Sequence, residues 1–248
     1  MSRFVTLFVS GLLASSVVAA AEIKVLSAGA VEPGLRAFAQ LVKAETGHEL
    51  AIQFNTAPRI AERLAAGETF DILISPPAVI EQAGKNGKIV ADSRVPVGRV
   101  GVGVVVRSDA PLPNVASGDG LKQALLQADS VVYNTASTGL YLDRLFEKIG
   151  VVEQLKPKTT RYADGAAVME HMLKSKGSAI GFGAITEIRL YEPKGLRLVG
   201  PLPADVQNYT SYDAALMTGA SAAGPAKAAL ALLATPAAKA AFTAAGIE

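Results

Sequence analysis

The chain has 248 residues, of which 50% are hydrophobic and 19% charged. Its net charge of +2 gives no bulk attraction for nucleic acid or an anionic membrane, so any anion site must be local. The absence of cysteine excludes disulfides and thiolate chemistry, and two histidines are too few for a histidine-rich metal centre. We therefore expect no metal, no cofactor and no nucleic-acid partner.

The first 21 residues have the pattern of a cleaved secretory signal. Arg3 precedes an apolar run at 4–18, and three alanines at 19–21 provide a small-residue cleavage site. A retained membrane anchor is the alternative, but the apolar run is shorter than the ~20 residues that a spanning helix needs. We expect a mature periplasmic protein that starts near Glu22 and is not inserted in a membrane.

The first third of the mature chain alternates strands and helices. Apolar β-rich segments are followed by helical periodicity, and Gly47 and Gly67 end the first two helices. The predicted order is strand 23–27, a helix that starts near Pro33, strand 49–54, a helix to Gly67, strand 70–75 and helix 78–85. This pattern predicts a parallel sheet, whose ligands lie beyond the carboxyl ends of its strands.

A second series of elements follows a β run at 100–106 and a loop at 107–119. It comprises helix 121–128, strand 130–133, helix 139–149, strand 158–162, helix 165–174, strands 178–182, 196–199 and 209–217, and helices 225–234 and 236–245. We predict an α/β fold of two lobes, each a sheet flanked by helices, with a ligand cleft between them. Residues 22–98 and 206–248 would form lobe I, and residues 99–205 lobe II.

The turn at 133–142 is the most informative stretch. A short buried strand leads into Ser137, Thr138 and Gly139, where a helix begins. Free backbone N–H groups and the positive end of the helix dipole favour an anion there. An ordinary helix cap is the alternative for this stretch alone. Similar turns follow Ser27 and Phe54, so we expect three helix starts around one cleft.

Several segments together resemble the periplasmic molybdate-binding protein family, across essentially the whole mature chain. They are 25–29, 61–67, 70–74, the Ser-Thr-Gly-Leu-Tyr-Leu turn at 137–142, and the Gly-Pro-Leu-Pro-Ala-Asp-Val-Gln run at 200–207. The resemblance implies a type 2 periplasmic binding-protein fold and a monomer.

Three hydroxyl groups of the true molybdate binders are missing here. The two serine positions fall at Ala30 and at Ala57 or Pro58, and the tyrosine position falls near Phe182. Each lost donor in a dry site costs ~1–3 kcal/mol, which argues against tight molybdate binding.

Two arginines lie at the expected ligand edge. Arg59 follows Pro58 at a helix start, and Arg161 ends a strand beside Tyr162. A guanidinium matches a carboxylate in bidentate fashion, which favours a small organic acid; solvated surface charges are the alternative.

The chain also resembles the branch of this family that includes a periplasmic aconitate isomerase. Such an enzyme needs an acid and a base beside its substrate. The candidates are Asp164 and the tyrosines Tyr162, Tyr209 and Tyr212, although Asp164 also suits a helix cap and the tyrosines suit packing. We expect His48 at a surface strand start and His171 in a structural role.

The predicted function is a periplasmic solute-binding protein that captures a small anion, a di- or tricarboxylate rather than molybdate or tungstate, for an ABC importer. The alternative is a cofactor-independent aconitate isomerase on the same scaffold, with Asp164 and Tyr209 as catalytic residues. The expected ligand contacts are Ser27, Gly29, Ala30, Pro58, Arg59, Ser137, Thr138, Gly139, Arg161, Tyr162 and Phe182.

Overall fold

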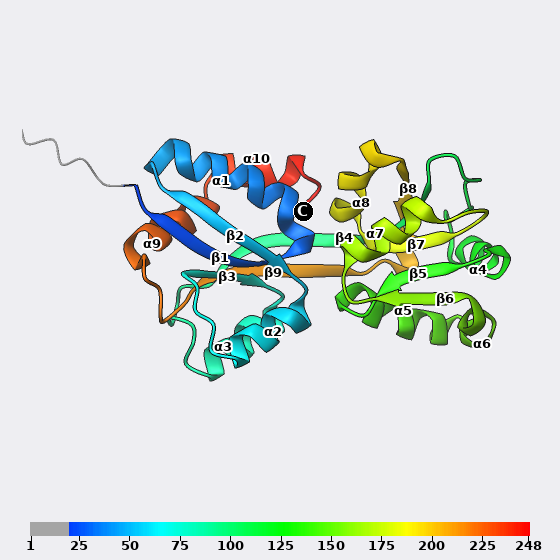
Figure 1. Ribbon diagram of the computed structural model, residues 1–248, viewed down its shortest axis with the longest axis horizontal. Helices are drawn as coiled ribbons and strands as arrows, with labels where there is room; N and C mark the ends of the chain where they lie inside the picture. The colour runs from blue at the N-terminus through cyan, green and yellow to red at the C-terminus, as the bar shows by residue number, and fades with distance from the viewer. Residues whose placement is uncertain (1–19) are drawn as a thin grey trace, which may run out of the picture.

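The computed structural model describes residues 20–248 (Figure 1). Residues 1–19, most of the expected secretory signal, lie outside the described residues. In the described part of the chain, no helix is long and apolar enough to cross a bilayer.

The strands of residues 20–248 form one nine-stranded sheet in the order β2-β1-β3-β9-β4-β7-β5-β6, with β8 beside β4. They are β1 (Glu22–Ala28), β2 (Glu49–Asn55), β3 (Ile72–Ser75), β4 (Val95–Arg107), β5 (Val131–Asn134), β6 (Thr159–Tyr162), β7 (Ile180–Ala184), β8 (Leu196–Pro201) and β9 (Tyr209–Leu216).

Helices flank this sheet in both halves of the molecule. The α-helices are α1 (Glu32–Thr46), α2 (Ala57–Ala65), α3 (Pro77–Lys85), α4 (Gly118–Gln127), α5 (Ser137–Lys148), α6 (Val152–Leu155), α7 (Gly165–Lys174), α8 (Ile185–Tyr191), α9 (Ala223–Leu233) and α10 (Pro236–Ala244). The 3-10 turns are η1 (Gly29–Val31), η2 (Lys156–Lys158), η3 (Glu192–Lys194) and η4 (Ala204–Val206).

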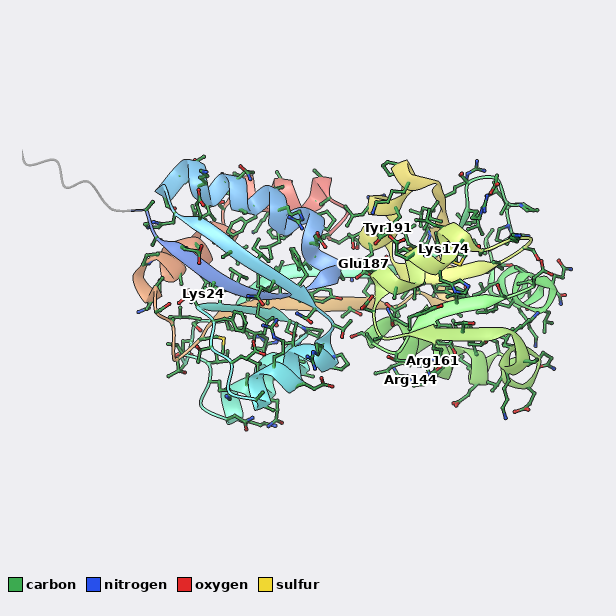
Figure 2. The ribbon with its side chains drawn as sticks, viewed as in Figure 1. Lys24, Arg144, Arg161, Lys174, Glu187 and Tyr191 are labelled. Atoms are coloured by element: carbon green, nitrogen blue, oxygen red, sulfur yellow. The ribbon has the colours of Figure 1, made fainter. Side chains whose placement is uncertain are left out.

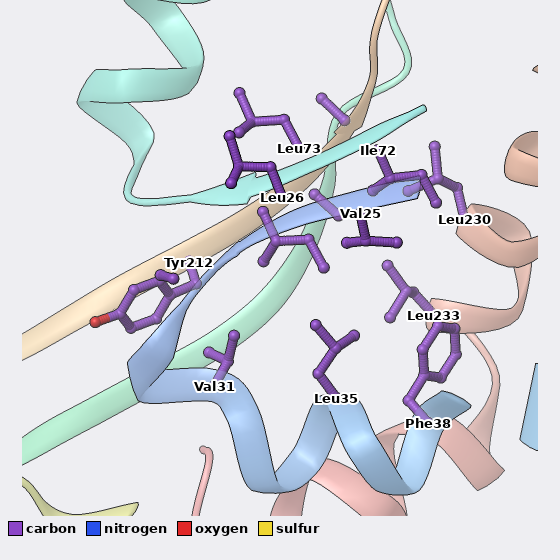
Figure 3. Close-up of a cluster of buried hydrophobic side chains, with 14 of the residues drawn as sticks. Val25, Leu26, Val31, Leu35, Phe38, Ile72, Leu73, Tyr212, Leu230 and Leu233 are labelled. Atoms are coloured by element: carbon purple, nitrogen blue, oxygen red, sulfur yellow. The ribbon is translucent and has the colours of Figure 1, made fainter. Parts of the chain in front are cut away.

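In lobe I, β1 pairs in parallel with β2 and β3, as the sequence predicts. Helix α1 begins with Pro33 in its first turn and ends at Gly47, whose φ of 73° lies in the left-handed region that favours glycine. Leu35 and Phe38 on α1 pack against Val25 in the buried cluster of Figure 3. This core fixes the carboxyl ends of β1, β2 and β3 at one edge of the sheet.

Lobe II has its own parallel pairs, in which β5 lies between β6 and β7. On one face of this sheet, Tyr133 of β5 and Phe182 of β7 pack with Phe146 of α5, and the rings of Phe146 and Phe182 lie 5.9 Å apart. The other face packs Val132 against Met169 of α7. Both faces are therefore covered, as expected for a parallel sheet.

Two strands cross between the lobes. The first half of β4 pairs with β9 in an antiparallel ladder, from Val95 to Gly101. The second half of β4 pairs with β7 and β8 in lobe II. Figure 1 shows β4 and β9 running together through the middle of the molecule. The α/β two-lobed class is thus confirmed; the residue bounds of the lobes stay a prediction.

Several element bounds differ from the sequence-based expectation. Strand β4 begins at Val95 and not at residue 100. Its ladder with β9 is irregular between Pro96 and Gly98, and these two residues interrupt the apolar pattern on which the prediction depended. Strand β7 spans 180–184 instead of 178–182. Helix α8 was not expected: its seven residues make less than two turns of the helix, too short a stretch for apolar periodicity to be distinct.

Candidate functional site

A cavity of about 840 Å³ lies between the lobes, beyond the carboxyl ends of β1, β2, β5, β6 and β7. Both lobes contribute to its walls, so opening or closing the lobes would change its shape. The polar and charged lining side chains are Glu32, Asn55, Thr56, Arg59, Glu62, Asn134, Thr135, Ser137, Thr138, Asp164, Glu187, Tyr191, Lys194 and Tyr212.

Two helices, α2 and α5, begin at this cavity. Helix α2 follows Thr56 and helix α5 follows Ala136, and in the described structure neither residue's side chain caps its helix. First-turn N–H groups have no partner inside their own helix, and the helix dipole makes this end positive. Both helix starts therefore offer donors to an anionic group in the cavity.

Asn134 shapes the turn before α5. Its buried side-chain oxygen accepts hydrogen bonds from the backbone N–H groups of Ala136, at 3.0 Å, and Gly139, at 3.1 Å. A Cβ on Gly139 would overlap the Asn134 carbonyl oxygen, so this turn requires glycine there. The Gly139 N–H is thus engaged by the protein, while Ser137 and Thr138 line the cavity.

Of the expected ligand contacts and the two expected catalytic residues, seven line the cavity. They are Gly29, Ala30, Pro58, Arg59, Ser137, Thr138 and Asp164. Asp164 also acts as a cap, because its Oδ1 accepts from the Ala167 N–H at 2.8 Å. Asp164 is therefore a helix cap, as one interpretation of the sequence predicted, and its catalytic role stays a prediction.

The other expected contacts lie elsewhere. Ser27 is buried and its hydroxyl donates to the Ala28 carbonyl, and Phe182 belongs to the lobe II core. Tyr162 shares a hydrogen bond of 2.7 Å with His171. Tyr209 is 41% exposed and lies beneath the guanidinium of Arg99.

Arg161 is engaged outside the cavity. Its guanidinium lies 2.9 Å from Asp143 and 5.1 Å from the ring centre of Tyr133. Burial raises the pKa of Tyr133 to about 12, and its hydrogen bond to Asp143 acts in the same direction. Figure 2 shows Arg161 in lobe II, away from Glu187 at the lobe boundary.

Each of the two histidines forms a hydrogen bond within the protein. His171 bonds to Tyr162 as described above, in line with the expected role. His48 was expected at the surface, but it is buried. Its Nδ1 accepts from the Ala21 N–H, just before β1.

Two cations reach the cavity, one from each lobe. Arg59 on α2 pairs with Glu62 at 2.8 Å, and its side chain is 63% exposed. Lys194 follows α8 and its Nζ lies 4.0 Å from the ring centre of Tyr191. Sequence reasoning identified Arg59 but missed Lys194, since η3 lies beyond the unexpected helix α8.

The most unusual group in the cavity is the carboxyl of Glu187, on the first turn of α8. Burial raises its pKa to about 7; the Ala184 backbone N–H opposes this, while the negative charges of Asp164 and Glu32 add to it. A Cβ on Gly165 would overlap its Oε2, and one on Gly29 would lie 3.3 Å from its Oε1. Glu187 thus sits between the first turns of α7 and η1.

Tyr212 of β9 also lines the cavity, and its ring belongs to the lobe I core. Its hydroxyl points away from the apolar cluster in Figure 3. Burial raises the pKa of Tyr212 well above its usual range, and the negative charge of the nearby Glu187 carboxyl acts in the same direction. This hydroxyl is therefore a neutral donor at physiological pH.

No group of three or more His, Asp or Glu side chains among residues 20–248 is arranged to hold a metal ion. The described site consists of helix starts, two cations, hydroxyl groups and carboxyls.

A two-lobed sheet with a polar interlobe cavity defines a ligand-binding protein of the periplasmic binding-protein class. Residues 23–248 match the family described as bacterial extracellular solute-binding protein, and the chain belongs to that family.

One curated relative and three solved structures are similar to this chain over most of its length. It is 29% identical over 221 residues to an aconitate isomerase from Pseudomonas sp., covering 84% of this chain and 81% of the relative. The periplasmic molybdate-binding protein of Azotobacter vinelandii superposes with a TM-score of 0.76 at 16% identity, over 91% of this chain and 98% of that one.

The sulfate-binding protein SubI of Mycobacterium tuberculosis gives a TM-score of 0.74 at 18% identity, over 92% of this chain and 86% of that one. PEB3 with bound L-phospholactate gives 0.69 at 15% identity, over 90% and 98%. The suspected family and branch are confirmed by these similarities, whereas the ligand is not settled by fold.

Proposed function

We propose that this protein captures a small organic di- or tricarboxylate in the cavity between its lobes. The observation that carries the proposal is the pairing of two helix starts, α2 and α5, with Arg59 at the rim of one cavity. Each helix start suits one carboxylate, and a guanidinium suits another. The cavity volume of about 840 Å³ lies in the range of sites for small organic ligands.

The lining also argues against a compact metal oxyanion. Ala30, and Ala57 or Pro58, line the cavity at the two positions where the resemblance to the molybdate-binding family implies serine hydroxyls. Within the same fold, PEB3 has L-phospholactate bound, so the scaffold accommodates an organic acid. We propose a periplasmic location, a monomeric protein and delivery of the ligand to an ABC importer, in keeping with the family.

A second candidate function is aconitate isomerisation, a shift of one proton between two carbons that flank a double bond. Two observations favour it: the similarity to an aconitate isomerase, and a carboxyl in the cavity, Glu187, whose pKa of about 7 suits proton transfer at neutral pH. Capture and isomerisation would use the same cavity, so the two functions differ in chemistry, not in the ligand class.

A binding panel tests the ligand class. We expect aconitate, citrate or a C4 dicarboxylate to raise the melting temperature of the purified mature protein, and molybdate, tungstate and sulfate to leave it unchanged. A large shift with molybdate and none with any carboxylate would refute the proposal. Incubation with cis- or trans-aconitate, followed by NMR, then separates an isomerase from a binder.

A further inference from the structure

Resting on the proposed isomerase function, we infer that the Glu187 carboxylate is the catalytic base, and that the same group removes the substrate proton and returns it to the other allylic carbon.

The position of Glu187 suits contact with a ligand held by both lobes. It follows β7 in lobe II, yet its carboxyl lies against Gly29 of lobe I and Gly165 of α7. The preceding residue, Thr186, is fully buried and donates its hydroxyl to the Ala30 carbonyl at 2.6 Å. The helix that carries Glu187 is therefore anchored to lobe I at the edge of the cavity.

Glu187 differs from the other carboxyls that line the cavity. Glu32 pairs with Arg36 at 2.6 Å, Glu62 pairs with Arg59, and Asp164 caps α7. Among residues 20–248, no ion pair involves Glu187. A carboxylate without a bound cation keeps its basicity, which a general base requires.

The charged and titratable groups around Glu187 are Asp164 at the start of α7, Glu32 at the start of α1, Tyr212 on β9, and Tyr191 on its own helix with Lys194 beyond. The negative charges of Asp164 and Glu32 disfavour the ionised form of Glu187, and burial does the same. These effects place the ionisation of Glu187 close to neutral pH, where a base can both take up and release a proton.

The reaction balances within one substrate molecule. The Glu187 carboxylate takes a proton from the CH₂ carbon, the C–H electron pair moves into a new double bond, and the old double bond becomes a carbanion stabilised by its neighbouring carboxylate. Glu187-H then protonates the far carbon. The negative charge that develops faces the helix starts of α2 and α5 and Arg59, which would stabilise it.

Other candidates are less suited to this role. The Oδ1 of Asp164 already accepts the Ala167 N–H as the cap of α7, so it is not free to take a proton from a substrate carbon. Tyr209 lies under Arg99, outside the cavity lining. Tyr212 remains protonated at neutral pH because of its raised pKa, so it could donate a hydrogen bond but not act as the base.

The test compares wild type with Glu187→Gln in D₂O, with Glu153→Gln, an exposed glutamate on α6, as the matched control. NMR measures cis/trans interconversion and deuterium entry at the two allylic carbons, and calorimetry measures aconitate affinity. We expect wild type and Glu153→Gln to behave alike. Glu187→Gln should bind aconitate within about fivefold of wild type and lose at least ~100-fold in both interconversion and exchange.

Glu187→Asp keeps the carboxylate but withdraws it by one methylene, and so serves if Glu187→Gln does not fold. We expect its rate to fall at least ~10-fold, and the acid limb of its pH–rate profile to move, because the ionising group has changed. Interconversion by Glu187→Gln within threefold of wild type, or an unmoved profile in Glu187→Asp, would overturn the assignment. Aconitate binding without interconversion by wild type would instead refute the isomerase function itself.

Discussion

The hydroxyl of Thr186 and the carbonyl oxygen of Ala30 form a buried hydrogen bond, 2.6 Å long, between the two lobes. Thr186 lies on α8 and Ala30 on η1, and these two elements are in direct contact. Because Ala30 also lines the cavity, this bond ties the relative position of the lobes to the shape of the ligand site.

Thr186→Val should lower the free energy of unfolding by about 1–3 kcal/mol, since it leaves a buried carbonyl without a donor. Urea denaturation measures the loss. Thr218→Val is the matched control: the Thr218 hydroxyl donates to the Gly87 carbonyl at an exposed site, where water can replace it. Equal effects of the two substitutions would contradict a special role for the interlobe bond.

Gly139→Ala should destabilise the fold by several kcal/mol, because the added Cβ would overlap the Asn134 carbonyl oxygen. Gly84→Ala on α3 is the contrasting change, since a Cβ there meets nothing within 4 Å and alanine favours the helix by roughly 0.5–1 kcal/mol. Thermal unfolding of both variants measures the difference. A Gly139→Ala variant as stable as wild type would refute this account of the turn.

Asn134→Asp should preserve the turn but weaken anion binding by about tenfold or more. The aspartate keeps the oxygen that accepts from Ala136 and Gly139, yet it adds a negative charge at the cavity wall. Asn86→Asp, at the end of α3, changes the net charge equally but lies outside the lining. Calorimetric titration with the carboxylate identified in the panel should detect weakening in Asn134→Asp alone.

Arg59 and Glu62 should act on ligand affinity in opposite directions. Arg59→Gln removes a carboxylate partner and should weaken binding about tenfold, whereas Glu62→Gln frees the guanidinium from its 2.8 Å pair and should strengthen it. The pair itself is exposed, so stability should change little. Arg197→Gln on β8 controls for loss of a surface cation. Unchanged affinity in both cavity variants would place Arg59 outside the binding site.

The pH dependence of stability should carry a signature of Glu187. Its pKa rises from 4.5 to about 7 on folding, so between these values the folded protein holds more protons than the unfolded chain. Stability from this group is therefore present at acid pH and lost as pH rises toward 7. In urea denaturation from pH 5 to 7.5, wild type should lose stability relative to Glu187→Gln; parallel curves would contradict the raised pKa.

Local sequence patterns predicted the alternating elements and the two-lobed fold, because apolar periodicity and glycine stop signals act within single helices and strands. The same patterns predicted that Arg59, Ser137 and Thr138 lie at the cavity, because helix starts that follow parallel strands converge at one sheet edge. Whether these side chains bind ligand stays a prediction.

Glu187 could not be recognised in the same way. Its environment comes from η1, α1 and α7, segments that are distant in sequence, and its own helix is short. One local signal existed: Ile185 and Ile188 at helical spacing, with an acidic residue in the first turn. Likewise, no local pattern shows that Asp143 engages Arg161 beside Tyr133.

Strand β4 belongs to the hydrogen-bonded ladders of both lobes, and β9 pairs with its first half. The connection between the lobes is thus a piece of shared sheet and not a loose linker. Thermal denaturation should consequently proceed as a single cooperative transition, and neither lobe should survive as an independent fragment. Any change in the relative position of the lobes would therefore have to bend or twist these paired strands.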